Sequence, residues 1–308
     1  MTDNTEPSGV RNRRPSSADS LLSAAKTFES KLEHSLLILW DDLPAWRRDN
    51  AFILSGYRQS RGSYTHSLRS LFYLHNESVN IWSHLLGAAV ALIGAAYVDR
   101  VVRPRYATAN VTDVVVFACF FGGAVVCLGM SATFHTLSNH SETVAKWGNK
   151  LDYTGIVALI VGSYVPALYY GFFCHPYLTR AYLSLICILG LGCAIVSWVE
   201  RFRTPRWRPY RTMMFVGLGL SGVVPIIQGA FVYGIQGLED RMSLSWTALH
   251  GAILAGLREP LPECLISGGS SHQIFHVFVI LAAATHFYGM AKAFDYHHTV
   301  LGSQCIEE

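Results

Sequence analysis

The sequence predicts an all-α membrane protein built from seven transmembrane helices. Hydrophobic residues make up 51% of its 308 residues and charged residues only 15%, whereas a soluble domain normally carries about 25% charged residues. The apolar residues fall into runs close to the roughly 20 residues that a helix needs to cross a bilayer. The seven cysteines form no Cys-x-x-Cys pair, so neither a disulfide scaffold nor a cysteine-rich zinc finger is indicated.

The first element, residues 1–55, is predicted to be a cytoplasmic tail. Its first 29 residues are polar and lack the apolar core of a signal peptide, so we expect them to be disordered. From Thr27 to Asp42, leucine and tryptophan recur at helical spacing, which predicts an amphipathic helix at the membrane surface. Leu43-Pro44 ends this pattern, and a polar, aromatic-rich stretch from Tyr57 to Ser83 leads into the first span.

Seven apolar segments then form the predicted membrane domain, residues 56–295, and residues 296–308 form a short outer tail. Glycine and proline occur within several segments, as membrane helices tolerate. The sixth segment is the shortest. The predicted spans are 81–99, 112–134, 153–173, 178–199, 212–234, 243–257 and 273–292.

The distribution of lysine and arginine predicts the orientation of these spans. With a cytoplasmic amino terminus, about three quarters of the 24 Lys and Arg residues fall on the inner side, as the positive-inside rule requires. The arginine-dense loop over 201–211 favours this orientation even without the tail. We therefore expect the amino terminus inside and the carboxyl terminus outside, inverted relative to G-protein-coupled receptors.

Three histidines and an aspartate are predicted to share the cytoplasmic layer of the membrane domain. His272 and His276 stand four residues apart at the start of the last span, so a helix places both on one face. The topology puts His135 at the inner end of the second span and Asp152 at the inner start of the third. Ser131 lies one turn before His135 and faces the same way. Because ionisable residues within a membrane are costly and usually functional, this layer is the candidate site.

Three histidines with one open position are the ligands of a catalytic zinc ion. Zinc lowers the pKa of its water to near neutrality, Asp152 would accept a proton or orient that water, and Ser131 would orient the water or the substrate. Structural alternatives stay open for two of these residues. Asp152 could be a partner for a helix end, and Ser131 could make a hydrogen bond between helices.

Five motifs occur in order across the membrane domain and cover about residues 56–295. They include the candidate site residues and extend beyond them on the amino-terminal side. The motifs are Gly56-Tyr57-Arg58, Glu77-Ser78-Val79-Asn80-Ile81-Trp82-Ser83-His84, Ser131-Ala132-Thr133-Phe134-His135, Leu151-Asp152-Tyr153-Thr154-Gly155 and Ser271-His272-Gln273-Ile274-Phe275-His276-Val277.

In these motifs the chain resembles the progestin and adipoQ receptor family, the group of adiponectin receptors and haemolysin III. The resemblance implies a seven-helix fold of inverted orientation, with zinc held by His135, His272 and His276, and Asp152 near the metal-bound water. It also implies a cavity open to lipid or cytoplasm. Some relatives are described as hydrolysing ceramide. The polar tail is similar to that of fungal members, which are linked to zinc and sterol homeostasis and to recognition of plant defence proteins.

One stretch departs from the family pattern. Before the last helix the family usually has an Arg-x-Pro-Glu run leading to Pro-Gly-x-Phe-Asp, and residues 258–270 of this chain lack the Phe-Asp pair. This loop would border the site, so we expect its conformation and its substrate contacts to differ. The three histidine ligands are intact.

The expected function is that of a zinc-containing receptor with ceramide-type lipid amide hydrolase activity, acting in lipid, sterol and zinc homeostasis signalling. The alternative is a non-enzymatic receptor in which zinc only staples the second and seventh helices; the lack of a fourth protein ligand favours hydrolysis, because structural zinc sites are usually closed. A transporter is disfavoured because no inverted repeat is visible.

The expected partners are a ceramide- or sterol-like membrane lipid and an extracellular protein ligand, and no nucleic acid. We expect a multi-pass protein of the plasma membrane or an endomembrane.

Overall fold

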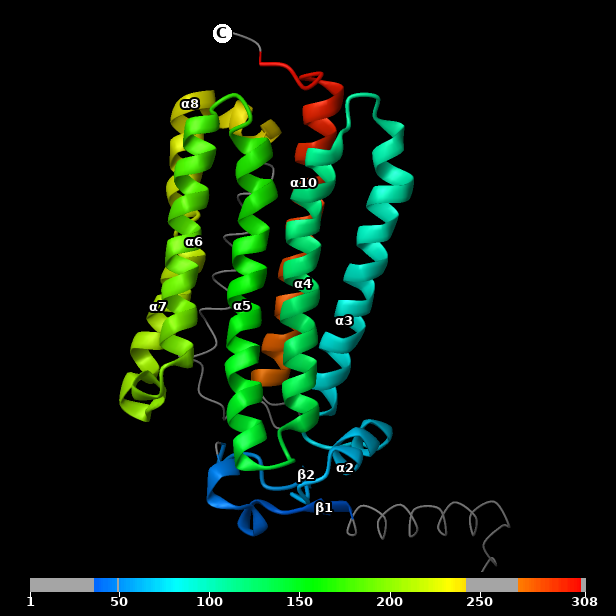
Figure 1. Ribbon diagram of the computed structural model, residues 1–308, viewed down its shortest axis with the longest axis vertical. Helices are drawn as coiled ribbons and strands as arrows, with labels where there is room; N and C mark the ends of the chain where they lie inside the picture. Colours follow the sequence, from blue (N-terminus) through cyan, green and yellow to red (C-terminus); the bar gives the residue numbers. More distant parts are fainter. Residues whose placement is uncertain (1–35, 49, 242–270, 306–308) are drawn as a thin grey trace, which may run out of the picture.

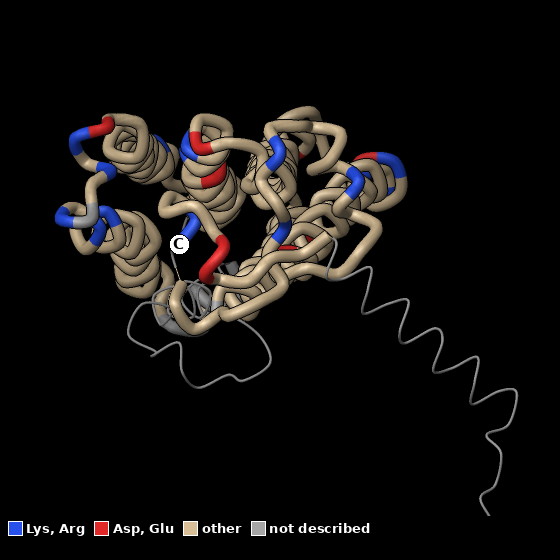
Figure 2. The backbone as a smooth tube through the Cα atoms, turned by 90° about the horizontal axis from the view of Figure 1, so that it is seen from below, with Lys and Arg blue, Asp and Glu red and all other residues tan. Residues whose placement is uncertain are grey.

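The computed structural model describes residues 36–48, 50–241 and 271–305 of the chain. Its long helices lie side by side in an elongated bundle, with the two short strands at one end and the carboxyl terminus at the other (Figure 1). Seen nearly end on, charged residues occur mainly in the segments that join the helices (Figure 2). This arrangement fits a multi-pass membrane protein. Six described stretches are long and apolar enough to cross a membrane: Ser78–Arg105, Val111–Leu137, Glu142–Gly171, Pro176–Trp198, Arg208–Gly234 and His272–Thr299.

These stretches confirm the all-α class and correspond to six of the seven predicted spans. The predicted fifth span is two helices that meet at Ser221 and Gly222. The predicted sixth span, 243–257, and the divergent loop over 258–270 lie outside the described residues. The helices are α3 (Ser78–Tyr97), α4 (Val111–Leu137), α5 (Glu142–Gly171), α6 (Pro176–Trp198), α7 (Arg208–Leu220), α8 (Val223–Arg241) and α10 (Ser271–Thr299).

Helix α5 begins earlier than the predicted span, which started at residue 153. The side chain of Ser141 accepts a hydrogen bond from the backbone amide of Val144 and caps the helix at Glu142, as serine commonly does. Glu142 also pairs with Lys146 one turn later, at 2.8 Å. The prediction marked only the apolar part of this helix, so Asp152 lies inside α5 and not at its start.

The amino-terminal segment forms a small structure at the end of the bundle. Strand β1 (Leu37–Ile38) pairs antiparallel with β2 (Tyr57–Arg58), and a 3-10 turn covers Trp40–Asp42. The amphipathic helix predicted over Thr27–Asp42 is therefore wrong for its last part, because pairing with β2 holds that part extended; residues 27–35 lie outside the described ones. Helix α2 (Tyr64–Arg69) follows, and the 3-10 helix η3 covers Ser70–Phe72.

Glycines bring α4 and α5 into close contact and fix their register. A Cβ atom at Gly148 would lie 2.9 Å from the ring of Phe134, and one at Gly155 would lie 2.8 Å from the Cα atom of Cys127. Since the two helices are antiparallel neighbours (Figure 1), these two contacts place Asp152 at the level of Ser131. The sequence predicted this shared depth, although it misplaced the helix start.

The opposite end of the bundle carries a disulfide bond and a buried polar cluster. Cys174, after α5, is bonded to Cys305 near the carboxyl terminus, a pairing that the cysteine spacing did not predict. The buried carboxylate of Asp113 accepts a hydrogen bond from Tyr170 at 2.8 Å and lies 3.3 Å from His298. These contacts tie α4, α5 and α10 together on the side away from the candidate site.

Candidate metal centre

The three predicted histidines meet where the end of α4 lies against the start of α10. The Nε2 atom of His272 is 3.3 Å from that of His135 and 3.2 Å from that of His276. His135 and His276 are buried, and one nitrogen from each of the three rings falls within a 4.8 Å group that could hold a metal ion. Within the described residues, no cysteine, aspartate or glutamate joins this group.

Hydrogen bonds on the far side of two rings fix which nitrogen carries the proton. The Nδ1 atom of His135 lies 2.7 Å from a carboxylate oxygen of Glu77, and that of His276 lies 3.2 Å from the backbone carbonyl of Asn80. Both partners are acceptors, so in the neutral rings Nδ1 carries the hydrogen and Nε2 presents a lone pair. Two lone pairs thus converge on one point, and acceptors behind the ligands are typical of histidine metal sites.

Glu77 is held as a carboxylate directly before α3. Asn80 donates a hydrogen bond to it at 2.7 Å, and a negative charge is favourable at a helix amino terminus. Burial alone would raise the pKa of Glu77, but the hydrogen bonds from His135 and Asn80 and the charge of Arg58 act in the opposite direction and hold the pKa below its ordinary value. The group therefore remains an acceptor for His135 at neutral pH.

Helix α3 contributes a further residue, His84, to the same place. Its ring stacks on that of His276 with 3.8 Å between centroids, and its Nε2 atom lies 3.3 Å from the backbone carbonyl of His276. His84 is buried but is not part of the metal-binding group. The spacing Glu77, Asn80, His84 puts all three on one face of α3, which is the sequence signal that could have identified this supporting face.

Arg58 connects the amino-terminal segment to the helix that carries His135. Its side chain is fully buried and donates hydrogen bonds to the backbone carbonyls of His135, at 2.6 Å, and Thr136, at 2.8 Å. Burial lowers the pKa of Arg58 to about 10, so it stays charged at neutral pH. Arg58 thereby caps the last turn of α4, where carbonyls lack helical partners.

The remaining predicted residues, Ser131 and Asp152, are not part of the metal-binding group. Ser131 is buried on α4 one turn before His135. Asp152 is half-buried on α5 at the level of Ser131. Their chemical roles stay predictions.

Replacing Glu77 with glutamine is expected to weaken the binding of a metal ion at the three histidines about 10- to 100-fold, because outer-shell partners of this kind contribute that much to metal affinity. The side-chain amide of glutamine fits the space of the Glu77 carboxylate, but its oxygen is a weaker hydrogen-bond acceptor for His135. Competition with a chelator would measure the affinity of purified protein. The matched control is Glu142→Gln, which removes an exposed carboxylate that pairs with Lys146 on the surface of α5. Equal affinities for the two variants would contradict the role of Glu77.

Comparison with known proteins places the chain among related membrane proteins. Residues 72–287 match the family model described as haemolysin-III related. The chain is 40% identical over 273 residues to ADIPOR-like receptor IZH2 of Saccharomyces cerevisiae, covering 85% of each protein. It is 42% identical over 275 residues to the adiponectin receptor protein of Drosophila melanogaster, covering 86% of this chain and 61% of that protein. It is 31% identical over 335 residues to heptahelical transmembrane protein 4 of Arabidopsis thaliana, covering 82% of this chain and 86% of that protein.

Proposed function

This chain belongs to the haemolysin-III related family of ADIPOR-like heptahelical membrane proteins, and on that premise we propose that it is a zinc-dependent receptor that hydrolyses a ceramide-type lipid amide. The observation that carries the proposal is the convergence of three histidine nitrogens, two of them fixed as lone-pair donors. Three imidazoles suit zinc. No cysteine or carboxylate among the described residues completes the set as a fourth ligand, which favours an open, catalytic site over a closed structural one.

The proposed ligands are His135, His272 and His276. A zinc ion held there would polarise an amide carbonyl and make a nearby water more acidic. Glu77 and Asn80 keep the ligand nitrogens correctly oriented by accepting hydrogen bonds from two of the rings. His84 and Arg58 hold the backbone at His276 and His135, so that the ligands of α4 and α10 stay in register.

Asp152 is the proposed proton carrier. Its carboxylate takes a proton from the attacking water as oxygen adds to the carbonyl carbon, and it returns the proton to nitrogen as the carbon–nitrogen bond breaks. The products are a fatty acid and a sphingoid base, and no oxidant or reductant is needed. The hydroxyl of Ser131 is the proposed group that orients the water or the amide, since Ser131 lies one helical turn from His135 and at the level of Asp152.

The disulfide bond supports the proposed orientation. Cys174 and Cys305 are joined at the end of the bundle opposite the histidines, and disulfides persist on the oxidising side of a membrane. The histidine end then faces the cytoplasm, in agreement with the lysine and arginine distribution. We propose that the protein resides in the plasma membrane or an endomembrane, that a ceramide- or sterol-like lipid reaches the site from the bilayer, and that an extracellular protein ligand can bind the outer face.

Purified wild type in lipid is expected to hold about one zinc ion per chain and to release fatty acid from ceramide. His272→Ala is expected to lose most of the zinc and all measurable hydrolysis, because two imidazoles alone bind zinc weakly. Metal analysis and fatty-acid release would be measured on the same samples. The matched control is His140→Ala, at the same end of the bundle but outside the metal-binding group.

Three results would count against the proposal. Wild type without zinc contradicts the metal site. Equal zinc in the His272→Ala and wild-type proteins contradicts the ligand assignment. Zinc without cleavage of any lipid amide, even with a candidate protein ligand present, contradicts the hydrolase and leaves the metal as a staple between α4 and α10.

A further inference from the structure

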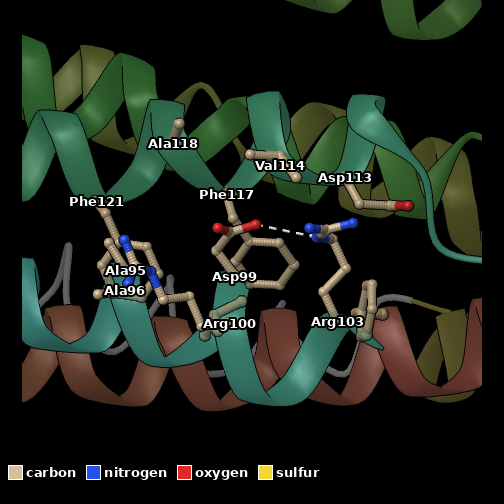
Figure 3. A pocket seen from close by; sticks show the side chains of 12 residues that line it. Ala95, Ala96, Asp99, Arg100, Arg103, Asp113, Val114, Phe117, Ala118 and Phe121 are labelled. Atoms are coloured by element: carbon tan, nitrogen blue, oxygen red, sulfur yellow. Dashed lines mark hydrogen bonds and ion pairs between the residues drawn. The ribbon is translucent and has the colours of Figure 1, made fainter. Parts of the chain in front are cut away.

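A second candidate site lies at the other end of the bundle. A cleft of about 320 Å³ opens between α3 and α4 (Figure 3). Its wall is mainly apolar and includes Ala95 and Ala96 of α3 with Val114, Phe117 and Phe121 of α4. These residues belong to the end of α3 and the first half of α4, whereas His135 lies in the last turn of α4. The cleft is therefore separate from the metal centre.

The mouth of the cleft is basic. Arg100 and Arg103 line it, and Arg105 follows two residues later. Arg103 pairs with Asp99 at 3.0 Å (Figure 3), while the ion pairs found among the described residues give Arg100 and Arg105 no acidic partner. This concentration of arginine is unexpected on the side of the membrane that the positive-inside rule leaves poor in basic residues.

One buried acid, Asp113, also lines the cleft, but its oxygens are already engaged. They accept hydrogen bonds from Tyr170 and from the backbone amide of Asn110, both at 2.8 Å, and one of them lies 3.3 Å from His298. Asp113 therefore serves the packing of α4 against α5 and α10. The exposed charge at the mouth remains positive.

The backbone at the mouth is unusual. Residues Val98–Val102 form a π-helical turn directly after α3. Such turns are rare and occur frequently at functional sites. Asp99 and Arg100 of this turn line the same cleft as Ala95 and Ala96, which lie four residues earlier. This is an observation independent of the charge pattern.

We propose that the cleft binds an anionic phospholipid of the leaflet at this end. One acyl chain lies along the apolar wall at Phe117 and Phe121, and the phosphate meets Arg100, whose guanidinium can bind phosphate oxygens in pairs. The mouth stands at the end of a membrane span, where lipid headgroups lie. The arginines of the cleft match the charged headgroup of a phospholipid, and its apolar wall matches an acyl chain.

Native mass spectrometry of the full-length protein would test the proposal with phosphatidylserine and phosphatidylcholine of identical acyl chains. Wild type, given equal amounts, is expected to retain phosphatidylserine several-fold more. Arg100→Gln is expected to lose this preference, whereas Arg180→Gln, an exposed arginine of α6 at the same end, is expected to keep it. No preference in wild type, or an equal loss in both variants, would overturn the proposal.

A second measurement locates the bound lipid. Phosphatidylserine carrying a photoreactive acyl chain is expected to label peptides from residues 95–121. Ala96→Phe fills the cleft from an exposed position, so it is expected to reduce labelling several-fold while thermal unfolding and zinc content stay unchanged. Labelling that falls elsewhere, or that persists in Ala96→Phe, would overturn the assignment of the cleft.

Discussion

Asp152→Asn is expected to leave zinc content unchanged and to lower kcat for ceramide hydrolysis about 10²- to 10⁴-fold, the usual contribution of a positioned acid–base group. Asparagine fills the same space but cannot carry a proton between water and the amide nitrogen. Because Asp152 is not part of the metal-binding group, its loss should spare the three histidines. KM is expected to change little, since a proton carrier acts mainly in the transition state.

The measurement needs zinc analysis and steady-state kinetics on the same preparation. Asp295→Asn is the matched control: Asp295 lies on α10 towards the opposite end and accepts a hydrogen bond from Tyr106 at 2.8 Å. Loss of zinc in Asp152→Asn would show that the aspartate supports the metal site. Wild-type turnover in a zinc-loaded variant would remove the proton-transfer role and leave a structural one.

The histidine cluster was predictable because its geometry is largely local. His272 and His276 share a helix face by spacing alone, and alternating membrane crossings bring the end of one span level with the start of another. Asp152 was placed at the right depth for the same reason, although polar residues extend α5 back to Glu142. An error in the predicted start of a helix does not change the predicted depth of its residues in the membrane, because two antiparallel helices keep the same register wherever their ends lie.

The supporting contacts were not predictable, because they depend on which helices pack together. Glu77 and His84 meet their histidine partners only because α3 lies against the junction of α4 and α10. The spacing of Glu77, Asn80 and His84 marks one face of the first span, but it does not say which other helices that face contacts. The bond between Cys174 and Cys305 is similar: the two are 131 residues apart in sequence, and only the folded bundle brings them together.

Arg58→Met is expected to destabilise the protein by about 3–5 kcal/mol, the scale for breaking a buried charged network. Besides its bonds to the carbonyls of His135 and Thr136, the guanidinium donates to the hydroxyls of Ser70 and Ser138, at 2.8 and 3.1 Å. Methionine matches the length of the chain but donates nothing. It would remove the guanidinium donors from the carbonyls of Thr136 and His135 at the end of α4. The carbonyl of His135, a proposed zinc ligand, would keep only the hydroxyl of Ser138 as a side-chain donor, at 3.0 Å.

The control for this variant is Arg61→Met, three residues away, where the guanidinium is exposed and donates to the side chain of Gln59. Thermal unfolding of both variants should separate them clearly, since exposed arginines contribute little to stability. The same unfolding experiment with added zinc tests whether Arg58 positions His135 or only stabilises the amino-terminal segment. If it positions His135, the stabilisation by a fixed excess of zinc shrinks in Arg58→Met, because binding to the native state is weaker. If that stabilisation equals the wild-type value, Arg58 secures the fold of the amino-terminal segment without tuning the metal site.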